Sequence, residues 1–127
     1  MAFDLKTFAP YLAASGTALI NLDENTTGAD DLSGELLIYV ADVIQAVSEG
    51  GDLPSLPTII AQGTQERITG AARVSLTVAA SVLPLAQFQV PAGKGRTALK
   101  YAGQVINQLL AGKPVSAIPA DLKKALQ

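Results

Sequence analysis

The feature that most limits the fold of this chain is a run of 20 residues, 74–93, without a charged side chain. Large apolar side chains such as Val78 and Leu83 alternate along it with small ones such as Ala79 and Ser81. Drawn as a helix, the run is apolar on every side. Such a helix has to be surrounded, either by other helices or by lipid. We therefore predict that this stretch is the central, enclosed helix of the fold.

The composition indicates an unusually large apolar surface. The 127 residues are about one domain in length, enough to bury a core without disulfides or metals. Hydrophobic residues make up 49% of the chain and charged residues 16%, with a mean hydropathy of +0.32. An average soluble domain is about 25% charged. Either other subunits cover part of this surface or a segment contacts a membrane, and self-association is the commoner cause.

The chain contains no cysteine and no histidine. This excludes disulfides, thiolate metal sites, cysteine nucleophiles and every histidine-dependent triad or metal site. The acidic residues that remain fall on predicted loops or on the polar face of a helix, so we expect no enzymatic activity and no cofactor. The first residues lack a basic segment followed by an apolar one, so we expect cytoplasmic synthesis without a signal peptide.

Charge is divided unevenly between the two halves of the chain. Residues 1–63 hold one basic residue and nine acidic ones, whereas residues 64–127 hold eight basic residues and two acidic ones. The halves either attract each other within one molecule, or an acidic face of one copy meets a basic face of the next. Nucleic acid is not expected as a partner, because no dense Lys and Arg cluster with interleaved aromatic residues is present.

A short first helix is predicted over residues 5–14. Asp4 or Thr7 would cap its start, and Gly16 would stop it. Pro10 is accepted only in the first turn, which favours Thr7 as the cap. The larger side chains of this segment would anchor it to the body of the protein as a packing plug: Phe3, Phe8, Tyr11 and Leu12.

The clearest helix is predicted over residues 30–48, where apolar residues recur at spacings of three and four. Gly50 ends it, and an extended connection with two prolines follows. Residues 97–111 form a further helix that stops at Gly112, and residues 120–126 form a last short one.

The third predicted helix carries the uncharged run and covers residues 57–84, with Pro57 as its first residue. The sequence leaves open whether it is continuous past Gly63 and Gly70. Pro84 is expected to kink or end it. Small residues four apart share one face, where another helix is expected to approach closely: Ala71, Ser75 and Ala79.

Two short motifs are incomplete. A calcium loop starting at Asp23 would place Gly28 sixth, as required, but its twelfth residue is Gly34 rather than Glu. The acids there suit the start of the next helix, whose dipole favours negative charge. A phosphate-binding loop ending at Lys94 would need a glycine where Phe88 stands. We therefore expect no metal site, and we interpret the basic loop at residues 91–97 as a solvated hinge.

The main alternative for residues 70–90 is contact with a membrane. About 20 apolar residues are needed to span a bilayer, and the run has that length. It also contains Pro84 and several polar residues, and Arg73 lies at its edge. Insertion scales penalise these features, so a helix buried in protein is preferred.

Together these features predict an all-α fold, with residues 1–127 as a single helical domain. We expect a bundle of three main helices plus short terminal helices around the central apolar helix. The functional hypothesis is a non-enzymatic structural or assembly subunit with protein partners, as a homo-oligomer or larger assembly. Small helical components of phage particles have this general character. The candidate interface consists of Ala71, Ser75, Ala79, Val78, Val82, Arg67, Arg73, Asp42, Glu49 and Lys100.

Two other functions remain open at this point. One is a membrane-active helical protein that uses residues 70–90. The other is a helical module that binds an apolar ligand or a partner helix in a pocket between helices. If opposite charges join neighbouring copies, high salt should separate them.

Overall fold

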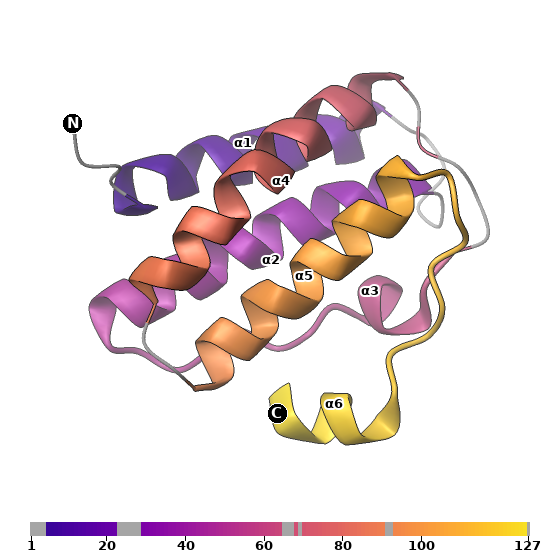
Figure 1. The fold of residues 1–127 in the computed structure, drawn as a ribbon. Helices are drawn as coiled ribbons and strands as arrows, with labels where there is room; N and C mark the ends of the chain where they lie inside the picture. Colours follow the sequence, from indigo (N-terminus) through magenta and orange to yellow (C-terminus); the bar gives the residue numbers. More distant parts are fainter. Residues whose placement is uncertain (1–4, 23–28, 65–67, 69, 91–92, 127) are drawn as a thin grey trace.

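The computed structural model describes residues 5–22, 29–64, 68, 70–90 and 93–126. These residues form six helices and no β-strand, which confirms the all-α prediction. Figure 1 shows the long helices packed together, with the short helices beside them in the lower part of the view. The helices are α1 (Leu5–Leu22), α2 (Ala29–Glu49), α3 (Thr58–Gln62), α4 (Gly70–Gln89), α5 (Lys94–Leu110) and α6 (Ala120–Leu126).

The central helix is α2. It packs against α1, α3, α4 and α5 (Figure 1), and its apolar stripe is almost completely buried. Leu36, Val40 and Val43 each have no exposed surface, and fully burying a side chain of this size contributes about 1.5–3 kcal/mol. The predicted central position of the uncharged run is therefore corrected, because α4 lies on the outside of α2 and is covered on one side only.

The first helix is longer than predicted. It begins at Leu5, places Pro10 inside the helix and continues through Gly16 to Leu22. Thr7 therefore lies within the helix and not at its start, and Asp4 lies outside the described residues. Gly16 does not stop the helix because it lies at the contact with α2, where the missing side chain lets the two backbones approach.

The predicted third helix is divided in two. α3 is a single short turn that ends at Gly63, whose φ of 77° lies in the left-handed region. A new helix, α4, begins at Gly70 and runs through Pro84 to Gln89. Pro84 neither ends the helix nor faces the core, since its side chain is exposed.

Backbone pairing joins α3 to the segment that follows α5. The Thr64 amide donates to the Val115 carbonyl at 3.0 Å, and the Val115 amide donates back at 2.8 Å. The Ile118 amide donates to the Ala61 carbonyl at 2.8 Å. These bonds fix the path that carries the chain toward α6.

The remaining helix ends lie close to their predicted positions. α2 ends before Gly50, which has a φ of 71°, and α6 has the predicted bounds. α5 starts at Lys94, so part of the predicted hinge is helical. The Arg96 guanidinium donates to the Val90 carbonyl at 2.6 and 3.0 Å, which holds the end of α4 against the start of α5.

Candidate assembly surface

The two sides of α4 differ in what covers them. Its inner side packs against α1, α2 and α5 and alternates small and large residues: Ala72, Leu76, Ala79, Leu83 and Ala86, all at most 3% exposed. Its outer side presents Phe88 at 87%, Val74 at 67% and Leu85 at 50% exposure. The expectation that this helix is enclosed on all sides is therefore wrong for the single chain.

Five residues on the outer side of α4 follow one another at regular spacing, and we call them the outer stripe: Val74, Val78, Ser81, Leu85 and Phe88. The spacings between successive members are four, three, four and three residues. This is the spacing that keeps side chains on one seam of a helix, as in the pairing of helices in coiled coils. Val78 is half-buried, and the other four members are exposed.

The neighbouring helix α1 is also almost free of charge. α1 packs against α4, and residues 7–22 contain no charged side chain. Tyr11 is 53% exposed and its ring lies 5.3 Å from that of Phe8, with the planes tilted by 39°. The prediction that these side chains anchor the segment therefore holds for Leu12, which is buried, but not for Tyr11, which faces outward. We call the exposed sides of α1 and α4 together the α1–α4 surface.

Hydroxyl groups on this surface donate to the backbone of their own helix. Thr77 donates to the Arg73 carbonyl at 2.7 Å, and Ser81 donates to the Thr77 carbonyl at 3.0 Å. On α1, Thr17 donates to the Ala13 carbonyl at 3.0 Å. Because each donor is already satisfied, covering these side chains with another apolar surface leaves no hydroxyl hydrogen without a partner.

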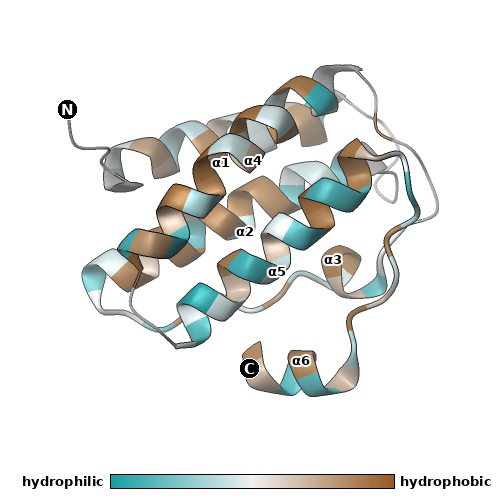
Figure 2. Ribbon diagram, viewed as in Figure 1, coloured by the Kyte–Doolittle hydropathy of each residue, from teal (hydrophilic) through white to brown (hydrophobic). Residues whose placement is uncertain are grey.

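Charged side chains lie mainly on the other helices. Figure 2 shows hydrophilic bands repeated along α5, whereas α1 is mostly neutral or hydrophobic in colour. Asp42 and Glu49 are exposed on α2, and Lys94 and Lys100 are exposed on α5. α2 and α5 pack against each other, so the acidic and basic halves of the sequence are neighbours within one chain.

The candidate interface residues of α4 do not share one environment. Val78 lies in the outer stripe, and Val82 and Ser75 are half-buried at its side. Ala79 is 1% exposed and belongs to the chain's own core. Arg73 is exposed, and its Nη1 donates to the Leu110 carbonyl at 3.0 Å, which ties the start of α4 to the end of α5.

The other candidate interface residues lie apart from the outer stripe or outside the described residues. Asp42, Glu49 and Lys100 lie on α2 and α5. Arg67 and the side chain of Ala71 fall outside the described residues, as do Asp23 and Gly28 of the incomplete calcium motif. The sequence interpretation missed the exposed members Val74, Leu85 and Phe88. Their four-three spacing was the available signal.

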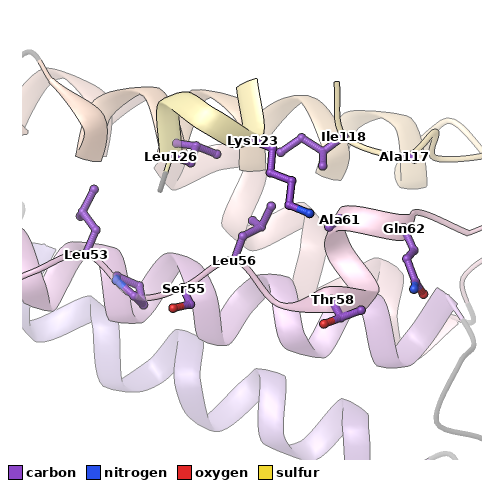
Figure 3. Close-up of a pocket in the computed structure, with 11 residues that line it drawn as sticks. Leu53, Ser55, Leu56, Thr58, Ala61, Gln62, Ala117, Ile118, Lys123 and Leu126 are labelled. Carbon is purple, nitrogen blue, oxygen red and sulfur yellow. The ribbon is translucent and has the colours of Figure 1, made fainter. Parts of the chain in front are cut away.

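A separate cavity lies between the extended segment before α3 and the C-terminal part of the chain. Its volume is about 530 Å³, and Figure 3 shows the side chains around it. Leu56 and Leu126 contribute apolar surface, while Lys123 extends from α6 toward Ala61. The wall is therefore mixed: apolar side chains form most of it, Ser55, Thr58 and Gln62 add polar groups, and Lys123 places a cationic group at its edge.

Few buried groups in the described residues can ionise. Burial raises the pKa of Tyr39, and neighbouring Tyr101 raises it further, while burial alone raises the pKa of Tyr101. The Tyr101 hydroxyl is buried without a hydrogen-bond partner among the described residues. Within that same part of the chain, acidic residues do not gather into a group that could hold a metal ion. Among the helices of the described residues, none combines the length and the hydrophobicity that a membrane-spanning segment requires.

Comparisons with known proteins found no match, whether to family models, to curated proteins or to solved structures. The α1–α4 surface and the cavity beside α6 are therefore interpreted from their physical chemistry.

Proposed function

We propose that this chain is a non-enzymatic structural subunit that associates with copies of itself through the α1–α4 surface. The observation that carries the proposal is the side chain of Phe88, 87% exposed and in line with Val74 and Leu85 on a side of α4 without charge. Single exposed apolar residues are ordinary on protein surfaces. Several large apolar residues exposed along one side of a helix, as here on both sides of Ser81, are typical of a surface that another molecule covers.

The energetic reason is the cost of leaving these groups in water. Fully burying one large exposed apolar side chain contributes about 1.5–3 kcal/mol, so the exposed parts of these three side chains favour association and oppose its entropy cost. No charged group of the outer stripe would have to be desolvated on contact. The hydroxyls of Thr77 and Ser81 are already bonded within the helix, so they add little cost.

The direct test is the mass of the purified protein in detergent-free buffer. Analytical ultracentrifugation should give a mass that rises with concentration above the 13.0 kDa of one chain. The double variant Leu85→Asp and Phe88→Asp should sediment as a monomer, because four carboxylates would have to be buried in each pair of chains.

A matched control carries the same charges elsewhere. Gln104 and Asn107 are exposed on α5 and lie three residues apart, as do Leu85 and Phe88. The variant Gln104→Asp and Asn107→Asp should associate like the unchanged protein. A wild-type chain that is monomeric at every concentration would contradict the proposal, and a chain that stays dispersed only in detergent would favour the membrane alternative.

The cavity beside α6 supports a second candidate function, binding of an apolar ligand with an anionic end. Its volume of about 530 Å³ lies within the roughly 300–1,000 Å³ range of ligand pockets. Lys123 at the edge would attract the anionic end. Binding of medium-chain fatty acids, measured by calorimetry, should be lost in the variant Ile118→Trp, which fills the cavity. Absence of binding to the unchanged protein would exclude this function.

A further inference from the structure

We infer that α6 is a hinged lid, which opens as a unit at Pro119 and forms a movable wall of the cavity of about 530 Å³. Two segments of the chain line this cavity. Figure 3 shows Lys123 and Leu126 of α6 on one side of it and Leu56 on the other. The inference does not depend on association through the α1–α4 surface, because it concerns a different part of the molecule.

Few contacts hold α6 to the rest of the described fold. Leu126 is its one buried side chain, at 6% exposure, while Leu122 is half-buried and the other residues of α6 are exposed. Among the described residues, α6 packs against α5 and forms no hydrogen bond or ion pair with another helix. A helix of seven residues is not stable alone, and ordering it costs more conformational entropy than one buried leucine returns. α6 is therefore able to open while the other helices stay folded.

The packing around α6 is also incomplete. Besides the cavity, a second hollow of about 220 Å³ lies between α5 and the C-terminal segment, lined by Val105 of α5 and Leu122 of α6 among others. Ala117 borders both hollows. Side chains that border empty space lack the van der Waals contacts that a close-packed interior provides. The two hollows thus weaken the attachment of α6 and leave space into which it can move.

The hinge lies where the backbone pairing of the C-terminal segment stops. The last bond of this pairing runs from the Ile118 amide to the Ala61 carbonyl, at 2.8 Å. Pro119 follows and has no amide hydrogen with which to continue the pairing. Its carbonyl accepts the Lys123 amide at 3.0 Å, in the first turn of α6. Hinges are commonly a few residues at the end of an element, so the segment up to Ile118 stays in place while α6 moves.

Opening of α6 changes the shape of the cavity. Lys123 and Leu126 leave the wall, while Ile118 remains, so the cavity becomes a wider groove. Closing returns one cationic and one apolar side chain to a position across from Leu56. A lid of this kind closes over a molecule in the cavity and excludes water from it.

Single cysteines test the lid, since the sequence contains none. Leu126→Cys places a thiol on the buried side of α6, and Val115→Cys, at a position 2% exposed, places one on the fixed part of the same segment. Gln104→Cys, on the exposed side of α5, gives the rate of an open thiol. The reaction of each variant with a soluble aromatic disulfide is measured in native buffer and divided by its rate in concentrated urea, which removes differences in intrinsic reactivity.

The lid predicts three different rates. Leu126→Cys should react about 10–100 times more slowly than Gln104→Cys, and Val115→Cys at least about 100 times more slowly than Leu126→Cys. The rate for Leu126→Cys should also change little at low urea concentrations, because opening of α6 exposes little surface. Equal rates for Leu126→Cys and Val115→Cys would overturn the inference. If both were slow, α6 would be fixed, and if both were fast, the whole C-terminal segment would detach.

Hydrogen exchange of the unchanged protein needs no substitution in α6. Amides in the last turn of α6, residues 124–126, should be protected at least about 10-fold less than the amides of Val115 and Ile118. Exchange resolved by nuclear magnetic resonance gives these values. Uniform protection from residue 115 to residue 126 would show that the cysteine at position 126 had loosened α6 by itself, and it would overturn the inference.

Discussion

Gly16 and Gly34 lie against each other where α1 packs on α2, with no room between the backbones for a side chain. A Cβ atom at Gly34 would lie 2.6 Å from the Gly16 carbonyl oxygen and 2.7 Å from Cγ1 of Ile20. A Cβ atom at Gly16 would meet the Gly34 carbonyl oxygen and lie 2.8 Å from Cγ1 of Ile38. The side chain of Ile20 thus lies over Gly34, and the side chain of Ile38 lies over Gly16. The contact is therefore reciprocal.

This contact predicts that Gly16→Ala or Gly34→Ala destabilises the protein. The added methyl group would collide with backbone, so we expect the free energy of unfolding to fall by about 1–3 kcal/mol despite the better helix propensity of alanine. Gly103→Ala is the matched control, because Gly103 also lies inside a helix but has its nearest neighbours at 3.8 and 3.9 Å. It should be neutral or stabilise by up to about 1 kcal/mol. Urea unfolding followed by circular dichroism measures all three, and equal effects would show that the α1–α2 contact is looser than described.

Gly63 predicts a local effect at the junction of α3 with the C-terminal segment. Its φ is 77°, and a Cβ atom there would collide with the Val115 carbonyl. Gly63→Ala should break the Thr64–Val115 pairing and raise amide exchange at Thr64 and Val115. Gly112→Ala is the control, since Gly112 has a φ of 73° but open space around it. That variant should lose only about 1–2 kcal/mol for the left-handed backbone and keep the pairing protected. Hydrogen exchange followed by mass spectrometry distinguishes the two, and unchanged exchange in Gly63→Ala would refute the contact.

Replacing Phe88 and replacing Leu36 with alanine should have different effects on the free energy of unfolding. Leu36 is completely buried in α2, so Leu36→Ala should lower the free energy of unfolding by about 2–5 kcal/mol at any protein concentration. Phe88→Ala should change the stability of the isolated chain by less than about 0.5 kcal/mol. It should instead abolish the rise of the melting temperature with protein concentration that association gives the unchanged chain. A concentration-independent melting temperature in the unchanged chain would count against the proposed association.

Association through the α1–α4 surface should resist salt. The outer stripe has no charges, so association through it should persist when salt is raised from about 0.1 M to about 1 M, which shortens the Debye length from about 10 Å to about 3 Å. Contact between acidic residues such as Asp42 and Glu49 and basic ones such as Lys100 on another copy would weaken over the same range. Sedimentation at the two salt concentrations decides between them, and dissociation at high salt would favour the charged contact.

Two buried tyrosines predict loss of stability at high pH. Burial raises the pKa of Tyr39 and of Tyr101 above the value of about 10 that tyrosine has in the unfolded chain. Above pH 10 the unfolded chain therefore loses these protons first, so stability is full below that pH and falls as pH rises through the folded values. Tyr101→Phe should flatten this decline.

At neutral pH the same substitution should be neutral or slightly stabilising, because the Tyr101 hydroxyl is buried without a partner among the described residues. Ultraviolet titration of tyrosinate, together with unfolding at pH 7 and above pH 10, provides the measurement. A decline that stays the same in Tyr101→Phe would assign it to other groups.

The sequence by itself determined the helical class and the best-defined helices. The apolar stripe of α2 recurs at helical spacing, and Gly50 and Gly112 end their helices because local backbone conformation decides those points. The sequence also contained the four-three spacing of the outer stripe. That signal was hidden because the inner side of α4 carries an equally apolar pattern.

Only the tertiary structure decided which apolar side is covered. Leu76 and Phe88 are both large apolar residues on an uncharged helix, yet one has no exposed surface and the other is 87% exposed. The sequence suggested that Gly16 ends a helix, but Gly16 lies within α1. It is a glycine there because the backbone of α2 at Gly34 leaves no room for a side chain. The burial of a side chain and the close approach of two helices depend on where distant segments of the chain lie. A local sequence pattern does not give those positions.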